Sequence, residues 1–115
     1  MTDHQLPKTL KEQVDRNAQI RGDGIWLISP ETREEISFSE AQSRIADIAT
    51  QLFGLGLKEG ARVAIAAPNS VGSCLMFMGV VYAGFVAVPL NLVAGPAIIG
   101  YTLCHSEADV IFMTD

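Results

Sequence analysis

Residues 63–91 read VAIAAPNSVGSCLMFMGVVYAGFVAVPLN, and this stretch decides the fold class. It begins with an unbroken apolar run, Val63–Ala67, which has the length of a strand. Its lack of alternation predicts burial on both faces, as in a parallel sheet. Pro68-Asn69-Ser70 interrupts the run and offers a cap, so a helix is expected over residues 71–83, followed by a strand at residues 86–90. The helix is apolar on nearly every side and is therefore expected to be buried.

The segment before this stretch has the pattern of an amphipathic helix. Its apolar residues recur at spacings of three and four, which predicts one buried face: Ala41, Ile45, Ile48, Ala49 and Leu52. Ser39 is expected to cap the helix and to form a capping box with Gln42. Gly54 or Gly56 is expected to end it, because a glycine accepts the positive φ common at helix ends.

The alternation continues after residue 91. A third buried helix is expected at residues 96–106, and a last strand at residues 110–113. Six elements then follow one another as helix, strand, helix, strand, helix and strand. This order predicts an α/β fold with mostly parallel strands and right-handed crossovers.

Smaller elements precede this alternation. Residues 9–17 are polar and compatible with a short N-terminal helix. Residues 25–28 and 35–38 are β-prone runs, and together they predict a β-hairpin that turns around residues 31–33.

Length, charge and cysteine content narrow the class of protein. A chain of 115 residues suits one domain, and we expect residues 1–115 to form it, with residues 1–7 flexible. The net charge of -5 argues against a nucleic-acid partner, because binding phosphates requires clustered positive charge. Cys74 and Cys104 show no CxxC spacing, which indicates a reduced, cytoplasmic protein.

The absence of charge from Val63 to Ser106 raises the question of a membrane span. Residues 71–88 would be long enough to cross a bilayer. Glycines and prolines interrupt this window, however, and neither end carries the Lys or Arg residues that anchor and orient a span. The sequence therefore does not favour a membrane partner, and the polar N-terminus shows no signal peptide.

Candidate chemical groups are few. Gly54, Gly56 and Gly60 resemble a phosphate loop only superficially, because they follow a helix and precede a strand, the reverse of a dinucleotide-binding fingerprint. Cys104 and His105 are adjacent on the expected helix and point about 100° apart, so they cannot share a proton. We therefore predict no catalytic, cofactor-binding or metal-binding residue in this sequence.

Four segments carry a family resemblance through their order and spacing. They are ISFSEA (residues 36–41), GLKEGARVAI (56–65), VYAGFVAVPLN (81–91) and SEADVIFMTD (106–115). Together they resemble the N-terminal end of the adenylate-forming superfamily, which comprises acyl-CoA synthetases and AMP-dependent ligases, over about residues 8–115. Two positions depart from the family pattern, because Ala61 replaces a usual Asp and Tyr82 a frequent Lys. Ala87 and Asn91 favour acyl- or aryl-CoA ligases over peptide-synthetase adenylation domains.

The resemblance implies a partial N-terminal subdomain of an acyl-CoA synthetase-like fold. It also implies a reaction in which a carboxylate attacks the α-phosphate of ATP to give acyl-AMP, and a thiol such as CoA then displaces AMP. ATP, Mg²⁺ and CoA are implied for the full-length family, together with a small-molecule carboxylate, and no cofactor is expected for this chain alone. In the family the phosphate loop and the catalytic lysine lie further along than the four segments. We therefore expect a truncated N-terminal fragment that is inactive by itself.

Two alternatives remain open from the sequence. The first is a stand-alone, non-catalytic interaction module derived from such a ligase. It would bury its open apolar faces in a homo-oligomer or against the missing remainder of the ligase. The second, less favoured, is a small membrane protein.

Overall fold

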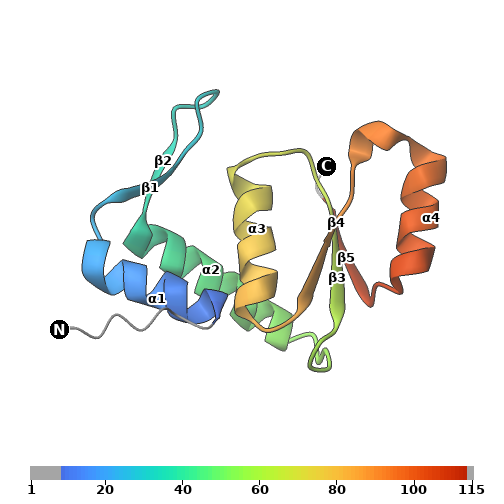
Figure 1. Ribbon diagram of the computed structural model, residues 1–115, viewed down its shortest axis with the longest axis horizontal. Coiled ribbons are helices and arrows are strands. Elements are labelled where there is room, and N and C mark those ends of the chain that lie inside the picture. The colour runs from blue at the N-terminus through green and yellow to red at the C-terminus, as the bar shows by residue number, and fades with distance from the viewer. Residues whose placement is uncertain (1–8, 114–115) are drawn as a thin grey trace.

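The computed structural model describes residues 9–113, so the prediction of flexibility for residues 1–7 lies outside the described residues. Figure 1 shows a parallel sheet with helices on both sides and a hairpin that projects from the N-terminal end. In chain order the elements are α1 (Leu10–Arg21), β1 (Ile25–Ile28), β2 (Glu35–Ser37), α2 (Phe38–Phe53), β3 (Arg62–Ala66), α3 (Val71–Tyr82), β4 (Val86–Pro89), the 3-10 helix η1 (Leu92–Ala94), α4 (Pro96–Ser106) and β5 (Val110–Met113).

The three-stranded sheet confirms the predicted α/β class. Its strands are parallel and lie in the order β4-β3-β5, with Val63 opposite Ala87 on one side and Val110 on the other. The crossover from β3 to β4 and the crossover from β4 to β5 run in opposite directions across the sheet, so crossovers of the same hand place α3 and α4 on opposite faces. Figure 1 shows this arrangement. Val63 and Ala64 at the centre are fully buried, as their unbroken apolar run predicts.

The predicted hairpin is also present. β1 and β2 pair antiparallel, with Ile28 opposite Glu35. The turn holds Arg33 at a positive φ of 62°, and the Arg33 N–H donates to the carbonyl of Ser29 over 2.7 Å.

The predicted start of α2 was wrong by two residues. Ser37, not Ser39, is the N-cap, and its hydroxyl accepts a hydrogen bond from the Glu40 N–H at 3.1 Å. Phe38, predicted as the end of a strand, is the first helical residue. The reason is tertiary, because the N–H groups of Phe38 and Ser39 donate to the carbonyls of Gly24 and Gly22, both over 3.0 Å. These carbonyls satisfy the N–H groups of the first two helical residues, and the Ser37 hydroxyl satisfies that of the third, Glu40.

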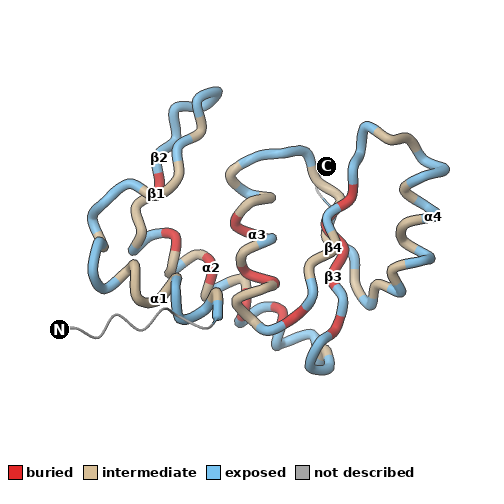
Figure 2. Tube along the Cα trace, viewed as in Figure 1, coloured by how far each residue is buried: buried red, intermediate tan, exposed pale blue. Residues whose placement is uncertain are grey.

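Two apolar clusters share α2 and α3. The first joins α2, β3 and α3 and includes Leu52, Val63, Met76 and Val80. The second lies beneath α1 and the hairpin and includes Ile36, Ala41, Ile45 and Leu75. Figure 2 shows that the buried positions concentrate on these central elements. Across residues 9–113, no helix is long and apolar enough to cross a membrane.

Helices α2 and α3 approach each other most closely at Gly79. A Cβ atom at this position would lie 2.8 Å from Cβ of Ile48 and closer still to its Cγ2. A methyl group therefore cannot fit without moving one helix, since the contacted atoms are next to the backbone of α2 rather than at a flexible tip. Gly79 is thus required for the spacing of the two central helices.

Arg62, at the start of β3, holds the connection between α4 and β5. Its guanidinium donates to the carbonyl of Ser106, the last residue of α4, at 2.7 Å. Its backbone N–H donates to the Asp109 carboxylate at 2.9 Å, and the Asp109 N–H donates back to the Arg62 carbonyl at 2.8 Å. The start of β3 therefore caps the C-terminus of α4 and sets the register of β5.

The prediction that the helix at residues 96–106 is buried was wrong. Helix α4 has the predicted bounds but no buried residue, and Ile98 and Tyr101 are 56% and 65% exposed. The apolar composition of α4 makes the helix suited to burial. Burial also requires another part of the protein to pack against it. Among residues 9–113, α4 packs mainly against η1, and Figure 2 shows it without a buried position.

Helix α1 is attached through a half-buried carboxylate. Asp15 accepts hydrogen bonds from the Tyr82 hydroxyl at 2.7 Å, from the Gln42 amide at 3.2 Å and from the Lys11 ammonium at 2.8 Å. Partial burial acts to raise the pKa of Asp15, but these three hydrogen bonds and the charge of Lys11 outweigh it and lower the pKa below its usual value. Burial, reinforced by the bond to Asp15, raises the pKa of Tyr82, which keeps its hydroxyl protonated as a donor.

We predict that Gly79→Ala destabilises the protein by about 1–2 kcal/mol, because overpacking outweighs the roughly 1 kcal/mol that alanine gains over glycine in a helix. Urea unfolding would measure this change. Gly72→Ala on the same helix is the matched control, since its nearest contact would be Ser70 Oγ at an ordinary 3.7 Å. Equal effects of the two substitutions would contradict the close-packing argument.

We also predict that Asp15 stabilises the fold in a pH-dependent manner. Because its pKa is lower in the folded than in the unfolded protein, its contribution is present above about pH 4 and disappears as the pH falls through the folded pKa. The difference in unfolding free energy between wild type and Asp15→Asn should therefore shrink in acid. Asp23→Asn, which removes an exposed carboxylate from the loop that follows α1, is the control. A difference that stays constant from pH 7 to pH 2 would refute the prediction.

Candidate functional site

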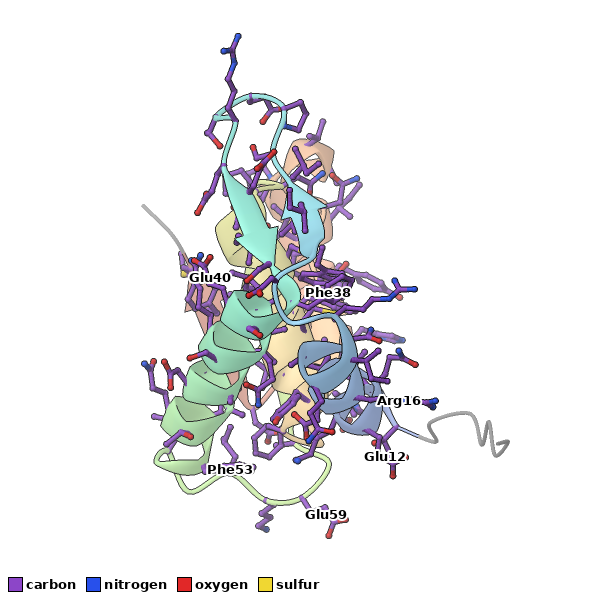
Figure 3. The ribbon with its side chains drawn as sticks, turned by 90° about the vertical axis from the view of Figure 1, so that its left-hand side faces the viewer. Glu12, Arg16, Phe38, Glu40, Phe53 and Glu59 are labelled. Atoms are coloured by element: carbon purple, nitrogen blue, oxygen red, sulfur yellow. The ribbon has the colours of Figure 1, made fainter. Side chains whose placement is uncertain are left out.

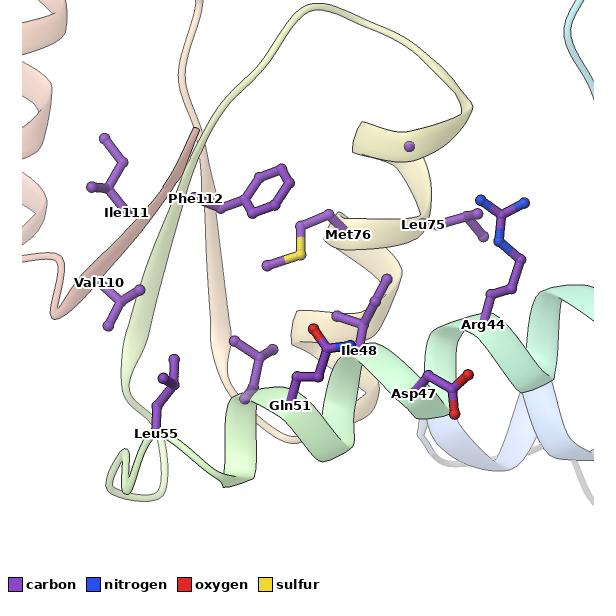
Figure 4. Close-up of a pocket in the computed structure, with 12 residues that line it drawn as sticks. Arg44, Asp47, Ile48, Gln51, Leu55, Leu75, Met76, Val110, Ile111 and Phe112 are labelled. Carbon is purple, nitrogen blue, oxygen red and sulfur yellow. The ribbon is translucent and has the colours of Figure 1, made fainter. Parts of the chain in front are cut away.

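An apolar groove lies between α2, the start of α3 and β5. Its volume is about 580 Å³. Figure 4 shows Met76 and Phe112 pointing toward each other across it, with Val110 and Leu55 nearby. The groove is therefore suited to hold apolar side chains.

The periodicity of α2, α3 and β5 determines which of their side chains line the groove. Ile48 and Leu52 lie one helical turn apart on α2, and Leu75 and Met76 come from α3. In β5 alternate residues point to opposite faces, so Phe112 contacts the core cluster beneath α3. Strand β5 has β3 on one side only within residues 9–113, which leaves its other edge beside the groove unpaired.

Polar side chains of α2 line one edge of the groove. Figure 4 shows Arg44, Asp47 and Gln51 there. Arg44 pairs with Glu34 of the hairpin at 3.6 Å and with Glu40 at 3.9 Å. Such solvent-exposed pairs are worth less than about 1 kcal/mol, so they orient Arg44 more than they stabilise the fold.

A second hollow lies at the carboxyl ends of β3 and β4. It has a volume of about 350 Å³, and its polar lining residues are Asn69 and Asn91. The chain leaves these two strands toward opposite faces, and such a crevice is where open α/β sheets bind ligands. Asn91, however, uses its side chain to accept from the Val93 N–H at 3.1 Å. Ser70 and Ser73 form a capping box at the adjacent start of α3. The hollow therefore presents amides and apolar groups but no acid or base.

The structure separates the groups that the sequence singled out. Cys74 is half-buried on α3, and burial raises the pKa of its thiol, which disfavours the reactive thiolate. Cys104 is exposed on α4, and the ring of its neighbour His105 stacks on Tyr101 with 5.0 Å between centroids. Gly54 and Gly56 lie in the turn that ends α2, and Gly56 takes a positive φ of 74°.

No metal or cofactor centre emerges from these groups. No cluster of three or more His, Cys, Asp or Glu side chains that could hold a metal ion occurs within residues 9–113. The Asp15 cluster brings four polar groups together, and Tyr82, Gln42 and Lys11 all donate to the Asp15 carboxylate.

The local sequence pattern does not predict the groove. It predicts that Ile48 and Leu52 lie on the buried face of a helix and that residues 110–113 form a strand, but it does not show that this strand lies at an edge of the sheet. The Asp15 cluster was also missed, although the departure from the family pattern at Tyr82 was a signal that this position is used differently.

Comparison with known proteins places these features in a family. Residues 9–115 match the family described as AMP-binding enzyme. The chain is 25% identical over 111 residues to the sulfoacetate–CoA ligase of Cupriavidus necator, which covers 96% of this chain and 22% of that protein. It is 31% identical over 84 residues to the long-chain-fatty-acid–CoA ligase FadD13 of Mycobacterium tuberculosis, covering 73% of this chain and 17% of the ligase.

Solved structures support the same assignment. The crystal structure of the N-terminal domain of FACL13 from Mycobacterium tuberculosis superposes with a TM-score of 0.85 and 26% identity, covering 93% of this chain and 27% of that one. The N-terminal subdomain of Klebsiella oxytoca NpsA, in complex with 3-hydroxyanthranilyl-AMSN, has the same fold, with a TM-score of 0.89 over 100% of this chain and 29% of that one at 24% identity.

The chain thus spans about a fifth of the length of the curated ligases it matches. Its parallel sheet corresponds to the N-terminal part of adenylate-forming enzymes, as the sequence motifs predicted. The chain belongs to the AMP-binding enzyme family.

Proposed function

We propose that these residues are the N-terminal portion of an ATP-dependent carboxylate–CoA ligase that works through an acyl-adenylate. The observation that carries the proposal is the family match over residues 9–115, in a chain whose relatives include several carboxylate–CoA ligases. The carboxylic acid of the complete enzyme is left unspecified, because the relatives differ in the acid they are named for.

Within such a ligase the described residues act as a folding scaffold. The β3–α3–β4–α4–β5 unit supplies a parallel sheet, while the unpaired edge of β5 and the apolar groove beside it offer a place for further polypeptide of the same enzyme. Exposed apolar side chains support this role: Met113 on β5 is 66% exposed and Val93 in η1 is 94% exposed.

The 115-residue chain by itself is proposed to be inactive. Activating a carboxylate with ATP requires donors that hold the phosphates and a cation that neutralises the developing pyrophosphate charge. These residues contain no Gly/Ser/Thr/Lys-rich phosphate loop, and residues 9–113 have no cluster of metal ligands.

We predict that the purified chain releases no pyrophosphate above background when supplied with ATP, Mg²⁺, CoA and a panel of aliphatic and aromatic carboxylates. A coupled pyrophosphate assay, with an intact acyl-CoA ligase as positive control, measures this. Carboxylate-dependent release by the 115-residue chain would refute the predicted inactivity.

The ligase assignment has its own test, which is to read the coding DNA beyond the codon for Asp115. An in-frame continuation with a Gly/Ser/Thr/Lys-rich loop within some tens of codons would support it. A stop codon would contradict it for the protein as made, and would favour the alternative below.

The alternative is a non-catalytic interaction or oligomerisation module. It is favoured by the exposure of α4, on which Ile98 and Tyr101 face solvent, and by the unpaired β5 edge, whose residues 110–113 carry no charge. An uncharged strand edge is a template for pairing with another chain. Self-association would cover both surfaces.

If this alternative holds, the isolated chain should associate as its concentration rises, and Met113→Lys should return it to a monomer by placing a charge at the β5 edge. Sedimentation velocity over a dilution series measures this. Glu59→Gln, which changes the charge by the same amount in a distant exposed turn, is the control. A chain that stays monomeric throughout would count against the module.

A cytoplasmic location is expected for either function, because both cysteines are free thiols.

A further inference from the structure

Helix α1 differs from the central helices in having no buried residue. Helix α2 by contrast buries Ala41, Ile45, Ala49 and Leu52. Most residues of α1 are polar, and its apolar Ile20 is 66% exposed. Figure 3 shows Glu12 and Arg16 pointing away from the rest of the molecule along the outer face of α1. Hydrophobic burial therefore holds this helix less firmly than it holds α2.

Polar contacts at Asp15 link α1 to both central helices, and the half-buried Val14 adds apolar packing against the core. Tyr82 of α3 and Gln42 of α2 both donate to Asp15 Oδ1, while Lys11 pairs with Oδ2. The Lys11 ammonium also lies 5.1 Å from the centre of the Tyr82 ring. One carboxylate thus joins three helices.

The turn after α1 is anchored separately. The carbonyls of Gly22 and Gly24 accept from the first N–H groups of α2, and the Gly24 N–H donates to the Arg21 carbonyl at 2.7 Å. A Cβ at Gly22 would lie 2.9 Å from the Ala18 carbonyl oxygen, so the chain turns tightly here. The turn is therefore held to the start of α2 by bonds that do not involve Asp15.

An apolar cradle lies beneath α1. A small cavity of about 60 Å³ is lined by Leu10 and Val14 from above and by Trp26, Phe38 and Met78 from below. Trp26 is the only tryptophan of the chain, so its environment reports directly on the position of α1.

We propose that α1 is a strap, latched at Asp15, that opens about the Gly22–Gly24 turn without unfolding the sheet and thereby uncovers the cradle beneath it. The Asp15 contacts contribute to the free energy of this opening, together with the packing of Val14 against the core. The device does not depend on the proposed ligase function, since it rests only on contacts within residues 10–82.

Hydrogen exchange of the whole chain, followed by NMR, tests the strap. In the wild type the amides of residues 14–21 should exchange on the order of a hundredfold faster than those of Val63–Ile65 in the central strand, because a subglobal opening needs less free energy than global unfolding. Asp15→Ala should speed exchange in α1 by roughly a further tenfold, the effect of losing charge-assisted hydrogen bonds, and leave β3 unchanged. Trp26 fluorescence should shift to the red in the same variant.

Tyr82→Phe keeps the ring and removes only the hydroxyl that donates to Asp15, so it carries the test if Asp15→Ala fails to fold. This variant should speed amide exchange in α1 by a few-fold and leave amide exchange in β3 unchanged. Glu59→Ala removes an exposed carboxylate outside both the latch and the hinge turn and should change exchange in neither segment. Equal protection of α1 and β3 in the wild type, or variants that speed both segments equally, would overturn the proposal.

Discussion

The close approach of α2 and α3 at Gly79 is the constraint on which the rest of the structure depends. Because residue 79 has no side chain, Ile48 can lie against the backbone of α3, and both apolar clusters form around the paired helices. Helix α3 in turn covers one face of the parallel sheet, and α1 rests on both helices. A wider separation would open the two clusters together, since α2 and α3 contribute to each.

Burial is distributed unevenly around this centre. The face of the sheet under α3 is packed, whereas α4 on the other side has no buried residue. The surfaces left open are apolar rather than charged, and residues 63–106 contain no Asp, Glu, Lys or Arg. Such surfaces are characteristic of a unit that packs against further protein, which agrees with a chain spanning about a fifth of its ligase relatives. The exposed apolar surfaces and the family membership therefore both support the proposal that these residues are the N-terminal portion of a larger ligase.

Sequence patterns predicted most of the fold because the deciding signals are local. The spacing of Ala41, Ile45, Ala49 and Leu52 identified the buried face of α2, and the unbroken run from Val63 identified a central parallel strand. The errors occurred where distant groups decide. The cap moved from Ser39 to Ser37 because carbonyls of the turn at residues 22–24 bind the first N–H groups of the helix. Helix α4 has the predicted bounds, but its exposure depends on what packs against it.

The sequence by itself determined the order of the elements, the α/β class and the resemblance to adenylate-forming enzymes, because periodicity, caps and motif spacing are encoded along the chain. Only the tertiary structure decided that β5 lies at an edge beside an apolar groove, that Asp15 meets Tyr82 from a position 67 residues away, and that Gly79 sets the distance between helices. The physical reason is that each of these features is a contact between segments far apart in sequence. Its energy depends on the distance between those segments in space, and no local pattern carries that distance.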